Sequence, residues 1–330
     1  MGKIRFATVG TSKITERFLS AGQLCEEEFE MTASYSRNLE RAEAFAREHG
    51  ADKWYDSLEV LGADSEIDAV YVASPNYMHH DQVCQLLKAG KHVICEKSIA
   101  SNYREAEEMF RTAKENQVIL LEAARNIFDP GMTVAKENLC KLGTIRRASI
   151  NYCQYSSRYD SFKEGQEHNI FKRECSAGAL MDIGVYCVHT LVYLLGEPDR
   201  IMGQSVMIRG DIDGAGSILA GYSDKVAEIK YSKITDSVLP TEIEGENGNM
   251  LIYGSNRPEK VKILYRDGRE ELLYDENEEM DMQHEIRRFA CMIQGREEVL
   301  PHVERSLTSM KIMDEVRRQC GISFPADERA

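Results

Sequence analysis

The sequence lacks the features that mark nucleic-acid-binding, membrane-spanning and secreted proteins. It has 41 Lys and Arg residues against 55 Asp and Glu, a formal net charge of −14, so it offers no general excess of positive charge to phosphate backbones or anionic lipid. No uninterrupted apolar run approaches the roughly 20 residues that span a bilayer. The N-terminal segment enters a strand pattern directly, without signal-peptide architecture. We therefore predict a cytoplasmic protein whose main partners are neither nucleic acid nor membrane.

Paired cysteine motifs are also absent. The nine cysteines are scattered without a Cys-x-x-Cys spacing, and several of them, such as Cys95, lie in apolar runs. This pattern predicts reduced, mostly buried thiols, not a disulfide framework or a zinc site. The neighbouring His79 and His80 point to different faces of a predicted helix, so no metal site is predicted.

The first third of the chain alternates short apolar strands with amphipathic helices. Strand patterns lie at residues 4–10, 31–36, 67–75, 92–97 and 118–124, and helical patterns at 38–50, 76–90 and 102–117. Apolar strands joined by helices are typical of parallel strands with crossover helices. We predict an α/β protein whose residues 1–124 form a doubly wound parallel sheet.

The rhythm changes after about residue 125. Strand patterns lie at residues 144–157, 217–234, 241–254 and 261–274, and Asn247-Gly248 and Asp267-Gly268 are suited to tight hairpin turns. An apolar helical stripe follows at residues 286–293. Residues 125–330 are therefore predicted to form a second domain with a mostly antiparallel sheet, one face of which is available to a partner subunit.

The turn after the first strand has only one of the three glycines of a G-x-G-x-x-G dinucleotide turn. Gly10 is present, whereas Ser12 and Thr15 occupy the other two places. The alternative is an ordinary strand-to-helix turn capped by Thr11 or Ser12. We favour a cofactor, because ligands of doubly wound sheets bind beyond the carboxyl ends of the strands. The predicted contacts in this turn are Gly10, Thr11, Ser12, Lys13 and Ile14.

The end of the second strand indicates which dinucleotide binds. An NAD site usually has an acidic residue here for the ribose hydroxyl, but this chain has Ser36 and Arg37, with Arg41 one turn further on. A hydroxyl and a guanidinium suit a 2′-phosphate. We predict that NADP(H) is preferred and that NAD(H) is possible; the alternative is that both arginines are merely solvated.

Two opposite charges, Glu96 and Lys97, follow the apolar run Val93–Cys95 directly. Desolvating an unpaired charge is costly, so the two are either a structural ion pair or part of a polar site. Motifs around them resemble the Gfo/Idh/MocA family of oxidoreductases. The resemblance lies in SPNYMHHDQVCQLLKAGKHVICEKS (74–98), GALMDIGVYCVH (178–189), EIEGENGNM (242–250) and MKIMDEVRRQCGISFP (310–325).

This resemblance implies a Rossmann domain, a C-terminal α/β domain with an open, largely antiparallel sheet, and a nicotinamide in the cleft between them. The implied activity is NAD(P)-dependent oxidation or reduction of a sugar, polyol or related small hydroxy or carbonyl compound. Homodimers or homotetramers through the open sheet are implied as well. By motif match, Ser74, Pro75, Asn76 and His79 line the nicotinamide side, Glu96 reaches the ribose, and Lys97, Asp182 and Tyr186 face the substrate.

The residue types suit these roles. Asp182 and Tyr186 are four apart and share one face of a predicted helix with His189. A phenol removes a hydroxyl proton near neutral pH only when a nearby cation lowers its pKa. We predict Tyr186 as the acid/base, Lys97 as the activating cation and donor to the substrate hydroxyl, and Asp182 as the orienting group.

Simpler interpretations stay open for several positions. Tyr186 and His189 are also consistent with hydrogen-bonded core residues, and Arg125 either contacts the cofactor or a substrate oxygen or only joins the domains. Substrate specificity is expected in residues 154–174, with Tyr155 and Arg158 as candidate contacts and His189 as a further one. Ser98 replaces the proline that follows the lysine in the family. Because a cis bond to a non-proline residue costs about 2.5–4 kcal/mol, we expect a trans Lys97–Ser98 bond.

Two rival functions use the same fold. One is a non-catalytic NADP-binding regulator, against which Lys97, Asp182 and Tyr186 together argue. The other is an NAD-dependent glycosidase, for which nothing in the sequence speaks specifically.

Overall fold

The computed structural model describes residues 2–276 and 282–329. The chain divides into two compact units, one of Met1–Ala123 with Met280–Leu307 and the other of Ala124–Glu279 with Thr308–Ala330. The boundary between Ala123 and Ala124 lies next to the predicted domain boundary at residue 124. Residues 280–307, however, belong to the first unit, whereas the sequence placed them in the second.

The first unit contains a six-stranded parallel sheet. Its strands are β1 (Ile4–Val9), β2 (Phe29–Tyr35), β3 (Lys53–Tyr55), β4 (Ala69–Val72), β5 (His92–Glu96) and β6 (Leu120–Ala123). Their spatial order is β3-β2-β1-β4-β5-β6, which is the order of a dinucleotide-binding Rossmann sheet. The predicted doubly wound sheet is therefore confirmed, and the order reverses between β1 and β4, where such folds bind their ligands.

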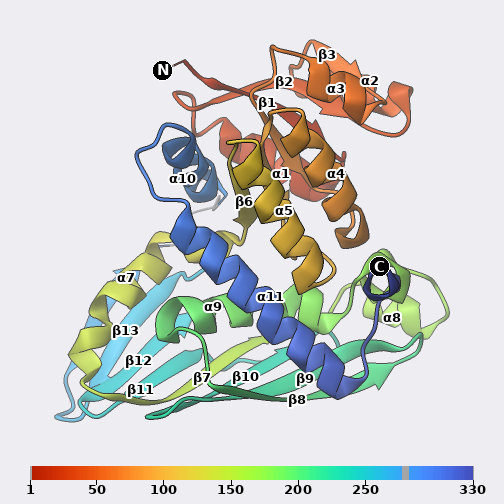
Figure 1. Cartoon of the computed structure of the whole chain (residues 1–330). Helices are drawn as coiled ribbons and strands as arrows, with labels where there is room; N and C mark the ends of the chain where they lie inside the picture. The colour runs from red at the N-terminus through yellow and green to blue at the C-terminus, as the bar shows by residue number, and fades with distance from the viewer. Residues whose placement is uncertain (1, 277–281, 330) are drawn as a thin grey trace. The chain divides into compact units, whose positions relative to one another are not determined.

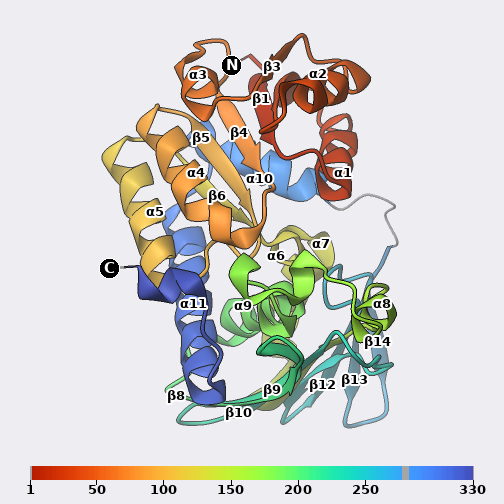
Figure 2. The same ribbon diagram turned by 90° about the vertical axis from the view of Figure 1, so that its right-hand side faces the viewer.

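Helices connect these strands and cover the sheet. They are α1 (Lys13–Gly22), α2 (Leu39–Glu48), α3 (Leu58–Ala63), α4 (Asn76–Lys88), α5 (Tyr103–Glu115) and α10 (Gln283–Ile293). Helices α4 and α5 pack side by side, as Figure 2 shows. Side-chain caps begin several helices: Asn38 accepts the Arg41 amide at 2.8 Å and Asn102 accepts the Glu105 amide at 3.0 Å.

Long-range packing explains why α10 belongs to the first unit. The ring centroid of Phe289 lies 6.0 Å from that of Phe6 on β1, and Phe6 stacks on Phe29 at 4.8 Å. The Arg287 guanidinium also donates to the Leu24 carbonyl at 2.8 Å. Burying this aromatic face of α10 provides the driving force.

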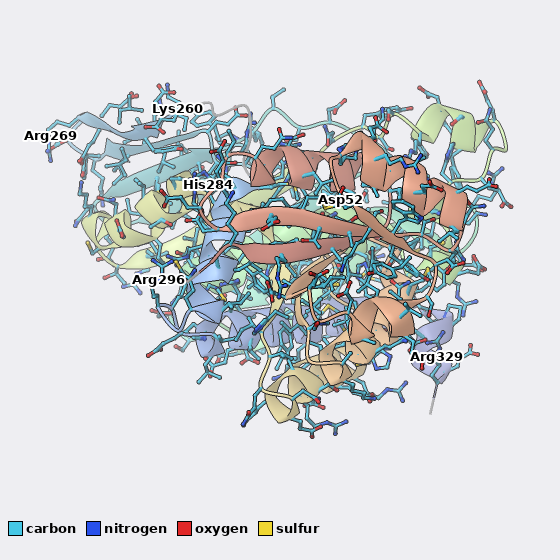
Figure 3. All side chains as sticks on the ribbon, turned by 90° about the horizontal axis from the view of Figure 1, so that it is seen from above. Asp52, Lys260, Arg269, His284, Arg296 and Arg329 are labelled. Carbon is cyan, nitrogen blue, oxygen red and sulfur yellow. The ribbon has the colours of Figure 1, made fainter. Side chains whose placement is uncertain are left out.

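The second unit contains an eight-stranded sheet. Its strands are β7 (Ile145–Cys153), β8 (Arg200–Ile208), β9 (Ile212–Gly221), β10 (Val226–Ser232), β11 (Thr241–Gly245), β12 (Gly248–Tyr253), β13 (Lys260–Tyr265) and β14 (Glu270–Asp275). The spatial order is β14-β13-β12-β11-β7-β10-β9-β8. All neighbours are antiparallel except β7 and β10. The predicted, mostly antiparallel sheet is confirmed; Figure 3 labels Lys260 and Arg269 on its β13–β14 hairpin.

Helices of the second unit cover one face of this sheet. They are α6 (Arg125–Phe128), α7 (Pro130–Asn138), α8 (Tyr159–Lys163), α9 (Val185–Leu195) and α11 (Leu300–Cys320), which the second unit shares from Thr308 onward. Figure 1 shows α7 and α9 on the same side of the sheet, where α9 packs on β7 and β10. A single turn of π-helix, η4 (Leu180–Gly184), directly precedes α9. Short 3₁₀ turns are η1 (Leu139–Leu142), η2 (Asn169–Phe171), η3 (Arg173–Cys175) and η5 (Pro325–Glu328).

One helical segment, Arg173–Leu195, is long and apolar enough to cross a membrane by length and composition. In the structure, 78% of its most apolar window is buried. The core helix of a soluble protein passes the same test, so this segment is weak evidence for a membrane span.

Candidate functional site

Gly10 begins the predicted cofactor turn and has a conformation that favours glycine. Its φ is +108°, and a Cβ at this position would lie 3.0 Å from the Ala73 carbonyl oxygen at the end of β4. Ser12 follows as the exposed N-cap residue of α1. The first amides of a helix have no partner within the helix and attract phosphate, so this turn retains the geometry of an anion site despite its missing glycines.

The end of β2 presents the residues predicted to select NADP(H). The half-buried Ser36 donates its amide to the Tyr55 carbonyl at 3.1 Å. Arg37 is exposed next to it, and Arg41 is exposed in the first turn of α2. The two guanidinium groups therefore stand in solvent at the strand end where an NAD site has a carboxylate.

The loop between β4 and α4 contains Ser74 and Pro75, and Asn76 begins α4; all three are half-buried. His79 lies behind this loop and is completely buried. Its two ring nitrogens are 2.7 Å from the Ser74 carbonyl and 3.0 Å from the Ser98 carbonyl, and burial lowers its pKa. The His79 side chain therefore packs against the backbone of this loop and of Ser98, and its role beside the cofactor stays a prediction.

Glu96 ends β5 and is held by a tyrosine that sequence reasoning missed. The Tyr71 hydroxyl donates to Glu96 Oε1 at 2.6 Å, and the Tyr71 ring stacks on Phe18 of α1 with 3.7 Å between centroids. Burial raises the pKa of Tyr71 well above its usual value, so its hydroxyl stays protonated as a donor. Glu96 is therefore fixed, and the half-buried Lys97 follows it.

The bond between Lys97 and Ser98 is cis, so the prediction of a trans bond is wrong. Contacts on either side of Ser98 hold this segment. The Ser98 carbonyl faces His79, and the Ile99 amide donates to the buried Glu122 carboxylate at 3.1 Å. These partners are remote in sequence, which is why the local sequence did not reveal the conformation.

In the second unit, Asp182 lies within the π-turn η4, and Tyr186 lies in the first turn of α9. The predicted continuous α-helical face therefore includes a wider turn, a feature frequently found at functional sites. The side chain of Asp182 is 32% exposed and forms an ion pair with Lys233, whose side chain is 6% exposed.

A second carboxylate supports the same turn from β9. Asp213 is completely buried and accepts the Leu180 amide at 2.7 Å. Burial raises its pKa to about 6, against the opposing effects of the amide hydrogen bonds and the Lys233 charge. Gly178, with φ of +115°, permits this approach, because a Cβ there would collide with Asp213 Oδ1.

Tyr186 is surrounded by a cation, an aromatic ring and a buried amide. Tyr186 is only 7% exposed. The Arg125 guanidinium lies 5.9 Å from its ring centroid, and the Tyr152 ring packs edge-on at 5.8 Å. The Asn126 side-chain amide donates to the Tyr186 carbonyl at 3.2 Å. Arg125, for which two roles were open, thus contacts the predicted acid/base.

The three candidate substrate contacts occupy different surroundings. The Tyr155 hydroxyl donates to Asp160 at 2.7 Å and accepts from Lys163 at 3.1 Å, and Arg158 is exposed. His189 is completely buried, with Nδ1 3.2 Å from the Ser309 hydroxyl. This is the environment of the core histidine that the sequence left as an alternative.

Sequence and structure comparisons identify the family. Residues 4–123 match the model of an oxidoreductase family with an NAD-binding Rossmann fold, and residues 140–251 match the GFO/IDH/MocA C-terminal domain. The chain is 44% identical to scyllo-inositol 2-dehydrogenase (NADP(+)) IolU of Bacillus subtilis (strain 168), over 98% of this chain and 99% of that protein. The chain belongs to the GFO/IDH/MocA family of oxidoreductases.

A dehydrogenase and a ketoreductase of lower identity are similar to the chain over nearly the whole length. The chain is 26% identical to trans-1,2-dihydrobenzene-1,2-diol dehydrogenase of Mus musculus, over 99% of each protein. Its fold resembles the crystal structure of KijD10, a 3-ketoreductase from Actinomadura kijaniata in complex with NADP and TDP-benzene. The TM-score is 0.86 at 24% identity, over 97% of this chain and 98% of KijD10.

Membership of the GFO/IDH/MocA family confirms that the protein is an oxidoreductase with a nicotinamide-binding Rossmann domain. The roles of individual site residues stay predictions. Among the residues that the structure describes, no group of three or more His, Cys, Asp or Glu is arranged to hold a metal ion.

Sequence reasoning missed Lys233 and Asp213 in this family member. Lys233 comes directly after the buried end of β10, as Lys97 does after β5. A charged residue at the end of a buried strand could thus have indicated a site residue at both places. Asp213 gave a weaker signal, because a single carboxylate between Ile212 and Gly214 also occurs in exposed turns.

Stability is expected to depend on pH through Asp213. The folded protein holds a proton on this carboxyl group at pH values where the unfolded chain, with an ordinary pKa of 3.8, has lost it. The resulting stabilisation is complete below pH 3.8 and is lost as the pH rises through about 6. Two pKa units correspond to about 3 kcal/mol.

The Asp213→Asn variant isolates this contribution, since the amide oxygen can still accept the Leu180 hydrogen bond. Between about pH 4 and about pH 7.5, we expect the natural protein to lose up to about 3 kcal/mol more unfolding free energy than the variant. Urea unfolding at a series of pH values measures this difference. Parallel curves for the two proteins would contradict the assignment.

Proposed function

We propose that the protein is an NADP-dependent dehydrogenase or reductase that acts on a secondary alcohol or ketone of a small polyol or sugar. The observation that carries this proposal is the 44% identity, over 98% of the chain, with an NADP(+)-dependent scyllo-inositol dehydrogenase. The dihydrodiol dehydrogenase relative supports a ring compound bearing hydroxyl groups as the substrate class.

The first unit fits NADP(H) at two places. Gly10 leaves room beside the end of β4 for close approach to the N-terminus of α1, where a pyrophosphate would lie. Ser36, Arg37 and Arg41 supply a hydroxyl and two guanidinium groups for a 2′-phosphate. Glu96, held by Tyr71, would bind a ribose hydroxyl. The half-buried Ser74, Pro75 and Asn76 would border the nicotinamide side.

In this proposal, Lys97, Asp182 and Tyr186 act on one substrate. The nicotinamide supplies or accepts the hydride when it is bound. The Tyr186 phenolate takes the proton from the substrate alcohol and becomes a hydroxyl; in the reverse direction this hydroxyl gives its proton to the ketone oxygen. Lys97 donates a hydrogen bond to the same substrate oxygen and stabilises the negative charge that develops there. Asp182 accepts a hydrogen bond from a neighbouring substrate hydroxyl and so fixes the ring orientation.

A two-step experiment tests this function. NADPH is first titrated while its fluorescence is followed, and NADH is titrated in parallel. Scyllo-inositol and other inositols, sugars and dicarbonyl compounds are then screened for a change in cofactor absorbance. We expect tighter binding of NADPH than of NADH and turnover of at least one cyclic polyol or its ketone. Binding of neither dinucleotide would refute the proposal.

Cofactor preference is expected to depend on Arg37. The Arg37→Ala variant removes charged hydrogen bonds to the 2′-phosphate, each worth about 1.5–3 kcal/mol. The Kd for NADPH should therefore rise by about 10- to 100-fold, while the Kd for NADH stays nearly constant. Arg47→Ala is the matched control, because Arg47 lies at the other end of α2, paired with Glu43. Equal effects of Arg37→Ala on both dinucleotides would contradict a 2′-phosphate contact.

We also propose a homodimer or homotetramer formed through the uncovered face of the second sheet. Residues paired across the strands share a face, and the β8–β9 end of this face includes Met202, Val206 and Leu219, which are 66%, 56% and 46% exposed. Exposed apolar side chains gathered on one sheet face are typical of subunit interfaces. Light scattering after gel filtration measures the subunit number. The nine free thiols support a cytoplasmic location.

A further inference from the structure

Lys233 is a buried lysine next to the proposed substrate-orienting carboxylate. It follows β10, and its amide donates to the Gly214 carbonyl at 2.8 Å. Its ammonium group forms an ion pair with Asp182 Oδ2 and lies 5.8 Å from the centroid of the Phe171 ring. A buried ammonium group is costly unless it is paired in good geometry. The interactions of Lys233 with these partners must therefore offset the cost of burying its charge.

The ion pair acts on a turn whose backbone is already anchored. Asp213 binds the Leu180 amide at the beginning of η4, and the Asp182 amide donates to the Gly178 carbonyl at 3.0 Å. The backbone of the turn is therefore fixed without Lys233. What Lys233 adds is control of the Asp182 side chain, because engaging Oδ2 sets the rotamer and thereby the direction of Oδ1.

We propose that Lys233 is a positioning residue for hydride transfer, acting by fixing the Asp182 carboxylate in the orientation that receives a substrate hydroxyl. This inference rests on the proposed function, in which Asp182 orients the substrate ring. Lys233 touches neither the reacting carbon nor the transferred proton in this scheme. Its effect on turnover is exerted entirely through Asp182, and this dependence distinguishes it from a lysine that only stabilises the fold.

A double-mutant cycle measures this dependence. The variants are Lys233→Met, which has a similar length without the charge, Asp182→Asn, and the two combined. We expect Lys233→Met alone to lower kcat/KM by about 100-fold, the effect of misplacing an orienting group by about 1 Å. In the Asp182→Asn background, the same substitution should change kcat/KM by less than about threefold, because no carboxylate is left to position. If the two substitutions lower kcat/KM by factors that multiply in the double variant, the proposal is overturned.

Two further variants separate positioning from folding. Lys233→Arg retains the cation and should recover at least a tenth of the natural kcat/KM, which a requirement for the lysine shape alone would not allow. Lys230→Met is the matched control, because Lys230 lies three residues earlier on β10 and is half-buried. The kcat/KM of this variant should equal that of the natural protein. If Lys233→Met does not fold, Lys233→Gln replaces it in the cycle, since its amide can still pack beside Asp182.

Failure of the proposed function would look different from failure of this inference. If the natural protein binds NADPH but turns over none of the screened polyols and ketones, the proposed function fails. The double-mutant cycle is then carried out on the free energy of unfolding, measured with urea. Asp182→Asn should then destabilise the protein by removing the charge that pairs with the buried Lys233 ammonium, and adding Lys233→Met should restore part of that loss. If the natural protein is active and the two substitutions act independently on turnover, the inference about Lys233 fails and the proposed function stands.

Discussion

Replacing Tyr186 with phenylalanine is expected to lower kcat by about 10²- to 10⁴-fold, the usual contribution of a general acid/base. Phenylalanine retains the aromatic ring, so the edge-on contact with Tyr152 and the position beneath the Arg125 guanidinium are preserved. The Tyr186 carbonyl also keeps its hydrogen bonds from Asn126 and Thr190. Only the hydroxyl is lost. Single-turnover oxidation of NADPH with the best substrate of the screen measures the chemical step directly.

The control for this substitution is Tyr152→Phe. Tyr152 packs against Tyr186, but its own hydroxyl lies 3.2 Å from Gln154, so its loss should leave kcat nearly unchanged. The Kd for NADPH should be the same in the natural protein and both variants, because the proposed cofactor contacts belong to the first unit and Arg125. Near-normal turnover by Tyr186→Phe would show that another group moves the proton.

Replacing Lys97 with alanine should also reduce kcat by at least about 100-fold. The ammonium group is proposed to donate to the substrate oxygen as negative charge develops there, and removing one such donor costs about 10²- to 10³-fold in kcat. Binding of NADPH should weaken much less, because the Tyr71 hydroxyl still holds Glu96 in the variant. Stopped-flow measurement of hydride transfer, together with the fluorescence titration, separates the two effects.

Lys88→Ala is the matched control for Lys97→Ala. Lys88 is exposed in the last turn of α4, in the same unit, so its removal changes the net charge equally without touching the proposed site. We expect its kcat to equal that of the natural protein. If Lys97→Ala retained its turnover but lost NADPH affinity, Lys97 would be a cofactor contact and its assignment to the substrate would be withdrawn.

Much of the fold could be predicted because its strands are encoded locally. The run at β4 is apolar throughout, and those at β1, β5 and β6 are mostly apolar, as expected of strands covered on both faces. The edge strand β8 was missed, since Gly203, Gln204 and Ser205 interrupt its apolar pattern and only one of its faces is covered. The strand β3 was missed as well, because three residues are too few to show a strand pattern. The assignment of α10 to the first unit depends on Phe289 meeting Phe6, a contact between residues remote in sequence.

The candidate site was predictable where a motif spans consecutive residues, as at Glu96-Lys97 and Asp182–Tyr186. It was not predictable where partners are distant. Lys233 and Asp182 are separated by 51 positions, and Asp213 and Leu180 by 33, so only the packing of β9 and β10 against η4 reveals their connection. The π-turn was missed for another reason: its sequence has the same apolar spacing as an α-helix, and the wider turn depends on tertiary contacts.

The discontinuous first unit has a consequence for protein engineering. Residues 1–123 alone omit α10, so a nucleotide-binding module transplanted with a single junction would leave the aromatic surface around Phe6 without Phe289. A chimera that exchanges cofactor specificity between relatives must therefore carry residues 280–307 as well. Because α11 begins in one unit and ends in the other, the last junction of such a chimera has to be placed inside this helix, with its helical register kept on both sides.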